Sequence, residues 1–96
     1  MNSCSEHLQK LKDLFPLLNS QYSVEQIGLF GSVARGEATT QSDVDIVIKA
    51  PPHPFALVHI KELLEEAFQC PVDVVRYRKN MNAFLKARID KDVIYI

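Results

Sequence analysis

Apolar residues recur in two long stretches at intervals of three and four positions, the spacing of one face of a helix. Pro16 should distort the last turn of the first helix, because proline lacks an amide hydrogen. A shorter third helix near the C-terminus has Asn80 or Asn82 as its cap. The expected helices cover about Ser5–Asn19, Phe55–Phe68 and a last segment that ends near Asp90.

Runs of β-branched and aromatic residues bounded by Gly, Pro and polar residues predict the strands. They cover Val24–Phe30, Val44–Lys49, Val72–Tyr77 and Val93–Ile96. Residues 32–36 have room for one helical turn, followed by a polar loop over residues 37–41. The resulting order, α-β-β-α-β-α-β, indicates an α+β (α/β) mixed sheet with helices packed mainly on one face, forming one domain over residues 1–96.

Two acids open the second strand. Asp43 and Asp45 share one face of it, because side chains alternate along a strand, and the face formed by Val44, Ile46 and Ile48 must be the core side. Neighbouring carboxylates repel each other, and Asp is a poor strand former. We therefore expect a cation between them, and Mg²⁺ is the hard divalent ion that prefers oxygen ligands.

A third acid, Asp73, interrupts the apolar run of the third strand. A partly desolvated carboxylate is costly unless a cation or hydrogen bonds compensate it. In the alternative interpretation, Asp43 caps a turn and Asp73 faces solvent at a sheet edge. For one acid alone the two interpretations are evenly matched. Three acids after a Gly-Ser turn favour a carboxylate cluster suited to one or two Mg²⁺ ions.

The turn itself consists of Gly31 and Ser32. Glycine allows the backbone to approach an anion closely, and serine offers a hydroxyl and an amide. The spacing to Gly36 resembles the start of a Walker A loop, but Glu37 and Ala38 stand where Lys and Ser or Thr are required. The chain is therefore not a P-loop protein, and Gly-Ser taken alone would indicate an ordinary turn.

Composition narrows the class of protein. The 96 residues are 47% apolar and carry 11 basic and 12 acidic side chains, so we expect no strong nucleic-acid binding. No basic segment followed by an apolar run begins the chain, and no apolar run approaches the ~20 residues that span a bilayer. We expect a cytoplasmic protein that does not associate with membranes.

These residues resemble a known family. Gly31-Ser32, ten further residues and then Asp43-x-Asp45, with Arg35-Gly36 between them and a later lone acid, are similar to the nucleotidyltransferases of the DNA polymerase β superfamily. A free-standing domain of this size resembles the minimal nucleotidyltransferases, or MNT proteins. Many of these are antitoxins paired with HEPN-domain ribonuclease toxins. The resemblance is best from about Val24 to Val75 and implies a polymerase β-like fold.

The resemblance also implies functions for individual residues. Asp43, Asp45 and Asp73 would be catalytic and would bind Mg²⁺, with Asp73 holding a second ion or accepting the proton of the attacking hydroxyl. The implied activity is transfer of a nucleoside monophosphate, AMP from ATP, to a tyrosine of a HEPN partner. The nucleotide-binding residues would be Gly31, Ser32, Arg35 and Ser42.

Two other functions remain open at this point. The chain could block its partner by contact alone, with a vestigial or structural acid cluster. It could also transfer the nucleotide to a small molecule, although related transferases of that kind usually carry further domains. Ninety-six residues leave little material for an acceptor-binding domain, which favours an acceptor on a partner chain.

Overall fold

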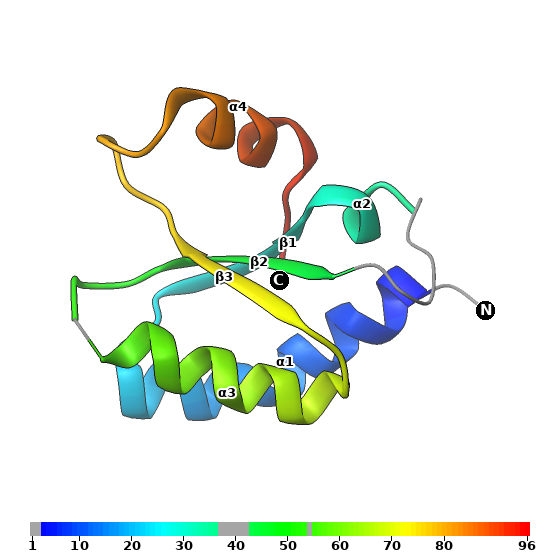
Figure 1. Ribbon diagram of the computed structural model, residues 1–96. Coiled ribbons are helices and arrows are strands. Elements are labelled where there is room, and N and C mark those ends of the chain that lie inside the picture. The colour runs from blue at the N-terminus through cyan, green and yellow to red at the C-terminus, as the bar shows by residue number, and fades with distance from the viewer. Residues whose placement is uncertain (1–2, 37–42, 54) are drawn as a thin grey trace.

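The computed structural model describes residues 3–36, 43–53 and 55–96 of the chain (Figure 1). Helices and strands follow one another in the predicted order, and the single helical turn expected after the first strand is present. The polar loop expected at residues 37–41 lies outside the described residues. The elements are α1 (Ser3–Tyr22), β1 (Gln26–Phe30), α2 (Gly31–Ala34), β2 (Val44–Lys49), α3 (Ala56–Phe68), β3 (Val72–Arg76), α4 (Ala83–Asp92) and β4 (Ile94–Tyr95).

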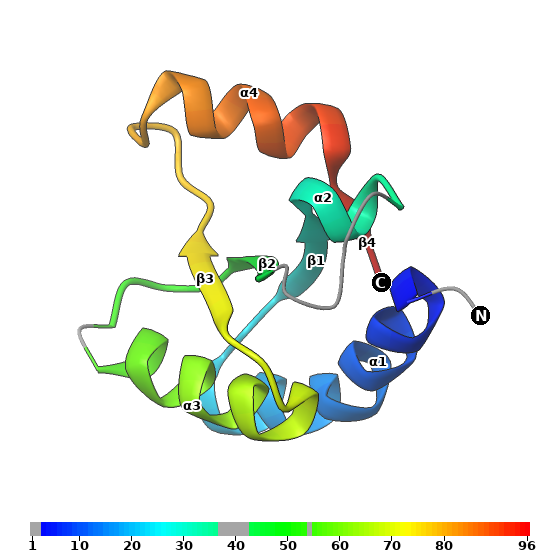
Figure 2. The ribbon, with the colours of Figure 1, turned by 45° about the vertical axis from the view of Figure 1, so that its right-hand side comes forward.

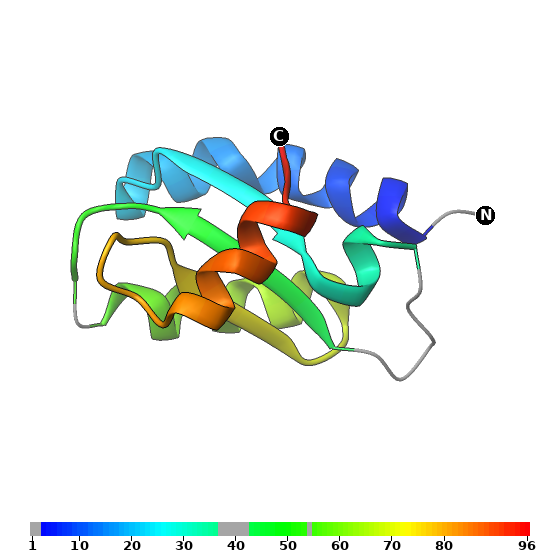
Figure 3. The ribbon, with the colours of Figure 1, turned by 90° about the horizontal axis from the view of Figure 1, so that it is seen from above.

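The four strands form one mixed sheet in the order β3-β2-β1-β4. β1 pairs antiparallel with both β2 and β4, whereas β2 and β3 run parallel. The long helices α1 and α3 lie side by side against one face of the sheet, and α4 crosses the other face (Figures 1 and 3). This arrangement confirms the predicted α+β sheet with helices mainly on one face.

The larger part of the core lies between the sheet and the helices α1 and α3. On β2, the side chains of Val44, Ile46 and Ile48 are at most 1% exposed and face these helices, as the alternation predicted. Leu11 of α1 and Ile60 of α3 are fully buried opposite them. Burying such side chains contributes roughly 1.5–3 kcal/mol each, so this layer dominates the stability of the domain.

A second, smaller core covers the other face of the sheet. Val47 of β2 and Ile89 of α4 are fully buried there, together with Phe30 and Met81. The face that carries Asp45 is therefore also packed, which the alternation of β2 alone did not indicate. α4 is consequently in a position to limit the access of water to that acid.

Two helix boundaries show how local chemistry acts. α1 continues past Pro16 to Tyr22. Pro16 has no amide hydrogen for the carbonyl of Lys12, but both residues lie on the exposed side of the helix, where water reaches that carbonyl. Asn82 caps α4, since its side-chain oxygen accepts hydrogen bonds from the amides of Phe84 and Leu85. Among the described helices, none is long and apolar enough to cross a membrane.

Candidate active site

Two predicted acids occupy directly paired positions. Asp45 of β2 is the register partner of Asp73 of β3, and on its other side it pairs with Phe30 of β1. Paired residues of neighbouring strands point to the same face, and the strands are ~4.8 Å apart. The two carboxylates therefore form one row across the sheet. The exposed Asp43 directly precedes β2, and thus the structure brings all three acids to one end of the sheet.

The environment of Asp45 opposes its negative charge. Burial raises the pKa of this carboxyl above its ordinary value of 3.8, and the charges of Asp73 and Asp43 raise the pKa further. Arg88 and, more weakly, Arg35 lower it. The half-buried side chain lies beside the second core, which explains the desolvation. A positively charged ligand between the acids would relieve both effects.

Gly31 allows the turn after β1 to pass close to this row. Its φ is +78°, a left-handed backbone conformation that residues other than glycine rarely adopt. A Cβ at this position would also overlap with Oδ2 of Asp45. Gly31 is buried and Ser32 is half-buried in the short helix α2. The backbone of the predicted phosphate turn therefore lies against the carboxylate predicted to bind the metal.

Arg35 follows α2 and has an ionic partner. Its Nη1 donates to Oδ2 of Asp92 at 2.6 Å, and the Asp92 side chain is only 7% exposed, against 37% for that of Arg35. Asp92 ends α4, so this ion pair joins the turn after β1 to the helix above the sheet (Figure 2). An Arg35 that contacts phosphate would have to do so from this anchored position. Ser42, the remaining predicted nucleotide contact, lies outside the described residues.

Sequence reasoning missed two residues of this region, Arg88 and Asp92. Both belong to α4, far along the chain from the acids, and only the fold brings the helix over the row. The available signal was the excess of basic residues after β3, which the near-neutral total charge conceals. α4 thus contributes both a positive charge near Asp45 and the anchor of Arg35.

The donors of this region suit a hard cation. Carboxylate oxygens are the ligands that Mg²⁺ prefers, and it commonly takes only one or two of them, completing its shell with water and phosphate oxygens. Within the described ranges, no three His, Cys, Asp or Glu side chains converge into a metal cage. The arrangement therefore fits a Mg²⁺ ion shared with a phosphate ligand better than a permanent structural metal.

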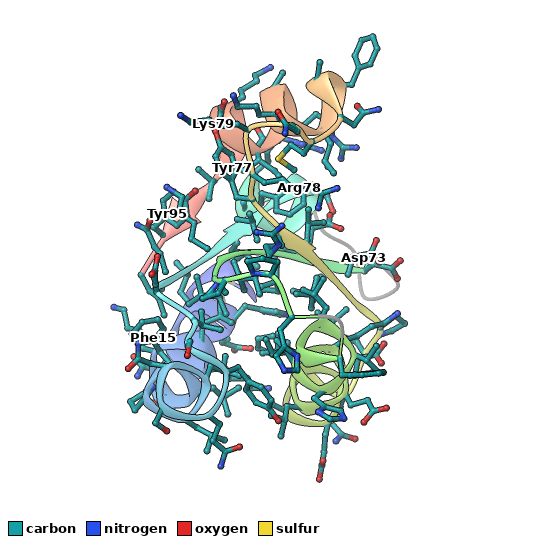
Figure 4. All side chains as sticks on the ribbon, turned by 90° about the vertical axis from the view of Figure 1, so that its left-hand side faces the viewer. Phe15, Asp73, Tyr77, Arg78, Lys79 and Tyr95 are labelled. Carbon is teal, nitrogen blue, oxygen red and sulfur yellow. The ribbon has the colours of Figure 1, made fainter. Side chains whose placement is uncertain are left out.

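Tyr77, Arg78 and Lys79 lie beyond β3, next to the start of α4, while Asp73 lies at the opposite end of the strand (Figure 4). The ammonium of Lys49 is 5.2 Å from the ring centre of Tyr77 and 5.1 Å from that of Tyr95. The Tyr77 hydroxyl donates to Asp90 at 3.0 Å, which raises the pKa of this tyrosine. The face of the sheet thus runs from an acidic end to a basic, aromatic end.

The histidines have structural contacts. Nδ1 of His53 accepts a hydrogen bond of 3.2 Å from the amide of Ala56 at the start of α3, and the ring of His7 stacks on Phe68 with 5.0 Å between ring centres. The His59 ring lies near that of Tyr22. Each of the three rings therefore contacts the helical layer formed by α1 and α3.

The sequence matches the family described as nucleotidyltransferase domain over residues 4–96. A Methanocaldococcus jannaschii protein that bears the name protein adenylyltransferase is 32% identical over 100 residues, covering 100% of both chains. The protein adenylyltransferase MntA of Thermococcus cleftensis is 32% identical over 81 residues, covering 82% of this chain and 81% of its own. The family match spans the positions of all the predicted site residues.

Solved structures share the fold. A minimal nucleotidyltransferase structure superposes with a TM-score of 0.77 at 22% identity, covering 95% of this chain and 93% of its own. The MNT antitoxin in a complex with the tri-AMPylated HEPN toxin of Shewanella oneidensis gives a TM-score of 0.68 at 20% identity, covering 93% of this chain and 70% of the solved one. The predicted α+β nucleotidyltransferase fold is thereby confirmed.

Proposed function

Because this chain belongs to the nucleotidyltransferase domain family, we propose that it is a Mg²⁺-dependent protein adenylyltransferase that acts as an antitoxin. Its substrate is ATP, and the acceptor is a hydroxyl, most simply that of a tyrosine, on a HEPN-type partner protein. The names of relatives at 32% identity support AMP transfer to protein. The likeness to an MNT antitoxin bound to a tri-AMPylated HEPN toxin supports the class of partner.

One observation carries the proposal: Asp45 and Asp73 form a row of carboxylates, and Gly31 lies directly against Asp45. A fold that needed only stability would gain from neutral side chains in these paired positions, because burial and neighbouring acids disfavour the charge of Asp45. An acid row beside a glycine turn is what a metal-bound nucleoside triphosphate requires. The turn approaches the phosphates, and the acids face the cation that accompanies them.

In the proposed reaction, the acceptor hydroxyl attacks the α-phosphorus of ATP in line with the departing group. A new P–O bond forms to the acceptor, the bond between the α- and β-phosphates breaks, and pyrophosphate leaves with the bonding electron pair. Asp73 accepts the proton of the attacking hydroxyl or holds a second cation, and its exposed position leaves it accessible to an acceptor. Mg²⁺, when bound by Asp43 and Asp45, supplies positive charge to the phosphates.

The phosphates themselves are held by the turn. Gly31 and Ser32 offer backbone amides and a hydroxyl, and Arg35 and Ser42 complete the nucleotide contacts that the family resemblance implies. Arg35 reaches the phosphates while Asp92 fixes its guanidinium. This division places neutral donors and an arginine around the triphosphate and leaves the acids to the cation.

The test is an intact-mass experiment. The tagged chain is expressed in cells of its source, its bound partner is recovered with it, and Mg-ATP is added to the purified pair. We expect the partner to gain the mass of one or more AMP units, and we expect Asp45→Asn to abolish the gain while the partner stays bound. Asp13→Asn, an exposed acid of α1, is the matched control and should leave the transfer unchanged.

The alternative functions give different results. A partner that binds tightly without a change of mass, and is inhibited equally by the Asp45→Asn variant, would show that the chain blocks its partner by contact. Recovery of no partner, together with modification of an added small-molecule hydroxyl, would identify a small-molecule transferase. Either result would contradict transfer to a HEPN protein.

A further inference from the structure

Charge is unevenly distributed in this nearly neutral chain. Residues 1–75 carry five basic and ten acidic side chains, a net charge of −5, whereas residues 76–96 carry six basic and two acidic ones, a net charge of +4. The two acids of the basic segment are both engaged, Asp90 by the Tyr77 hydroxyl and Asp92 by Arg35. The segment that covers the second face of the sheet is therefore a positively charged layer on an otherwise acidic domain.

The exposed side of α4 combines this charge with an apolar side chain. Leu85 and Ile89 face the second core, so the other side of the helix faces outward. Phe84 is 84% exposed, more than any other large apolar side chain among the described residues. We call the outward positions of this helix the α4 face; they are Phe84, Ala87, Arg88 and Lys91, spaced at helical intervals and all exposed.

Several cations near this face form no ion pair. Within the described part of the chain, Arg35 pairs with Asp92, and no carboxylate pairs with Arg78, Lys79 or Lys91. A basic surface with an exposed aromatic residue is an unfavourable combination for an isolated domain. Aromatic residues and arginine are, however, the side chains that most often anchor a protein partner.

The α4 face continues into the candidate active site. Arg88 belongs to it, and its positive charge acts on Asp45, the half-buried acid of the row. Phe84 lies one helical turn before Arg88 on the same side of α4. A molecule that contacts Phe84 and Arg88 therefore extends toward the carboxylates.

We propose that the α4 face is the docking surface for an acidic protein segment that carries the acceptor hydroxyl, with Phe84 as its apolar anchor. The proposal rests on the proposed function for the identity of this segment as the acceptor. Opposite charge selects the partner and accelerates the encounter, while burial of Phe84 holds it in place. Protein is favoured over nucleic acid because the patch offers one aromatic anchor flanked by Ala87, rather than a series of aromatic faces for stacked bases.

The test measures binding without nucleotide, using the full chain and a fluorescent copolymer of glutamate and tyrosine as the acidic probe. We expect Phe84→Ala to weaken binding about tenfold. We expect Lys91→Glu to weaken binding and to reduce its dependence on salt. The matched controls lie on the opposite layer: Phe55→Ala removes a phenylalanine that is 67% exposed, and Lys61→Glu reverses an exposed charge of α3. Both controls should bind the probe as the unaltered chain does.

Several results would overturn the docking surface. These are the absence of copolymer binding, an equal effect of Phe84→Ala and Phe55→Ala, and tighter binding of oligouridylate RNA than of the copolymer. Because the altered side chains are exposed, unchanged melting temperatures should accompany the binding defects. The assay is also independent of catalysis. Binding through Phe84 without AMP transfer to the partner would refute the proposed function alone, and transfer unaffected by Phe84→Ala would refute the docking surface alone.

Discussion

Asp45 and Asp73 are register partners on two parallel strands, and Asp45 is the more buried of the two. The pairing places like charges one strand apart, and the second core removes water from one of them. A domain of this size has little stability to spare. The row of carboxylates therefore lowers the stability of the folded domain, and a cationic ligand bound between the acids would offset this loss.

The first prediction concerns the melting temperature of the Asp45→Asn variant. Because the pKa of Asp45 is raised in the folded state, the native protein binds the proton more tightly than the unfolded chain. The carboxyl thus lowers stability as the pH rises through the window from 3.8 to the raised folded pKa. We expect Asp45→Asn to melt at a higher temperature than the unaltered chain at pH 7, and the difference to shrink below pH 3.8.

AMP transfer should fall at least ~100-fold in the same variant, because the carboxylate proposed to bind Mg²⁺ is lost. Melting curves from pH 3 to pH 8, with the exposed Asp13→Asn as control, measure the stability effect. If Asp45→Asn melts at a lower temperature than the unaltered chain at pH 7, the surroundings of Asp45 do not destabilise its negative charge.

The second prediction compares two glycines with nearly equal backbone angles, Gly31 at φ +78° and Gly36 at φ +74°. Alanine at Gly36 has free space around its Cβ, so it should cost only the backbone strain of about 1–2 kcal/mol. Alanine at Gly31 meets the Asp45 carboxylate as well and should cost about 3 kcal/mol or more. Denaturant unfolding measures both, and equal costs would show that the turn and the acid are not in close contact.

The third prediction concerns the ion pair between Arg35 and Asp92. Asp92→Asn should lower stability by only about 1 kcal/mol, because the guanidinium is partly exposed. It should raise the KM for ATP more than it lowers kcat, since Arg35 loses the anchor that positions it. Asp90→Asn, which removes the hydrogen bond from Tyr77 instead, is the matched control. Equal KM values in the two variants would leave Asp92 with a purely structural function.

The fourth prediction is that Mg²⁺ and ATP stabilise the chain only together. At a hundredfold excess over Kd, a ligand that binds the folded state adds about 2.7 kcal/mol. We expect this rise in melting temperature for the unaltered chain with Mg-ATP. EDTA should abolish both the rise and AMP transfer. Asp45→Asn should show little rise, and an undiminished rise in that variant would place the metal elsewhere.

Much of the fold was predictable because its signals are local. Strand β2 begins at Val44 and ends at Lys49 as predicted, since its alternation and its flanking polar residues both mark these ends. The position of Asn82 before a helical pattern makes it one of the two predicted caps, and Asn82 is the one that caps α4. The predicted start of β1 at Val24 is two residues early, because Val24 is buried but precedes the strand.

The site was predictable in part. The three acids and the glycine turn lie within 43 residues of sequence, and strand alternation places Asp43 and Asp45 together. Arg88 and Asp92 could not be found in this way, because Asp92 is 57 positions from Arg35 and only the crossing of α4 over the sheet joins them. The total charge also concealed the basic layer, since opposite charges cancel over the whole chain.

β3 is an outer strand of the sheet, and this position gives Asp73 a second consequence. An outer strand rich in valine presents unpaired backbone groups that can recruit a strand from another molecule, which is how aggregation begins. A charged side chain on such a strand discourages that pairing, and Asp73 is the exposed acid among three valines. Replacing it to test its proposed catalytic function would also remove this protection. Loss of activity in an Asp73 variant therefore has to be measured on protein that has been shown not to aggregate.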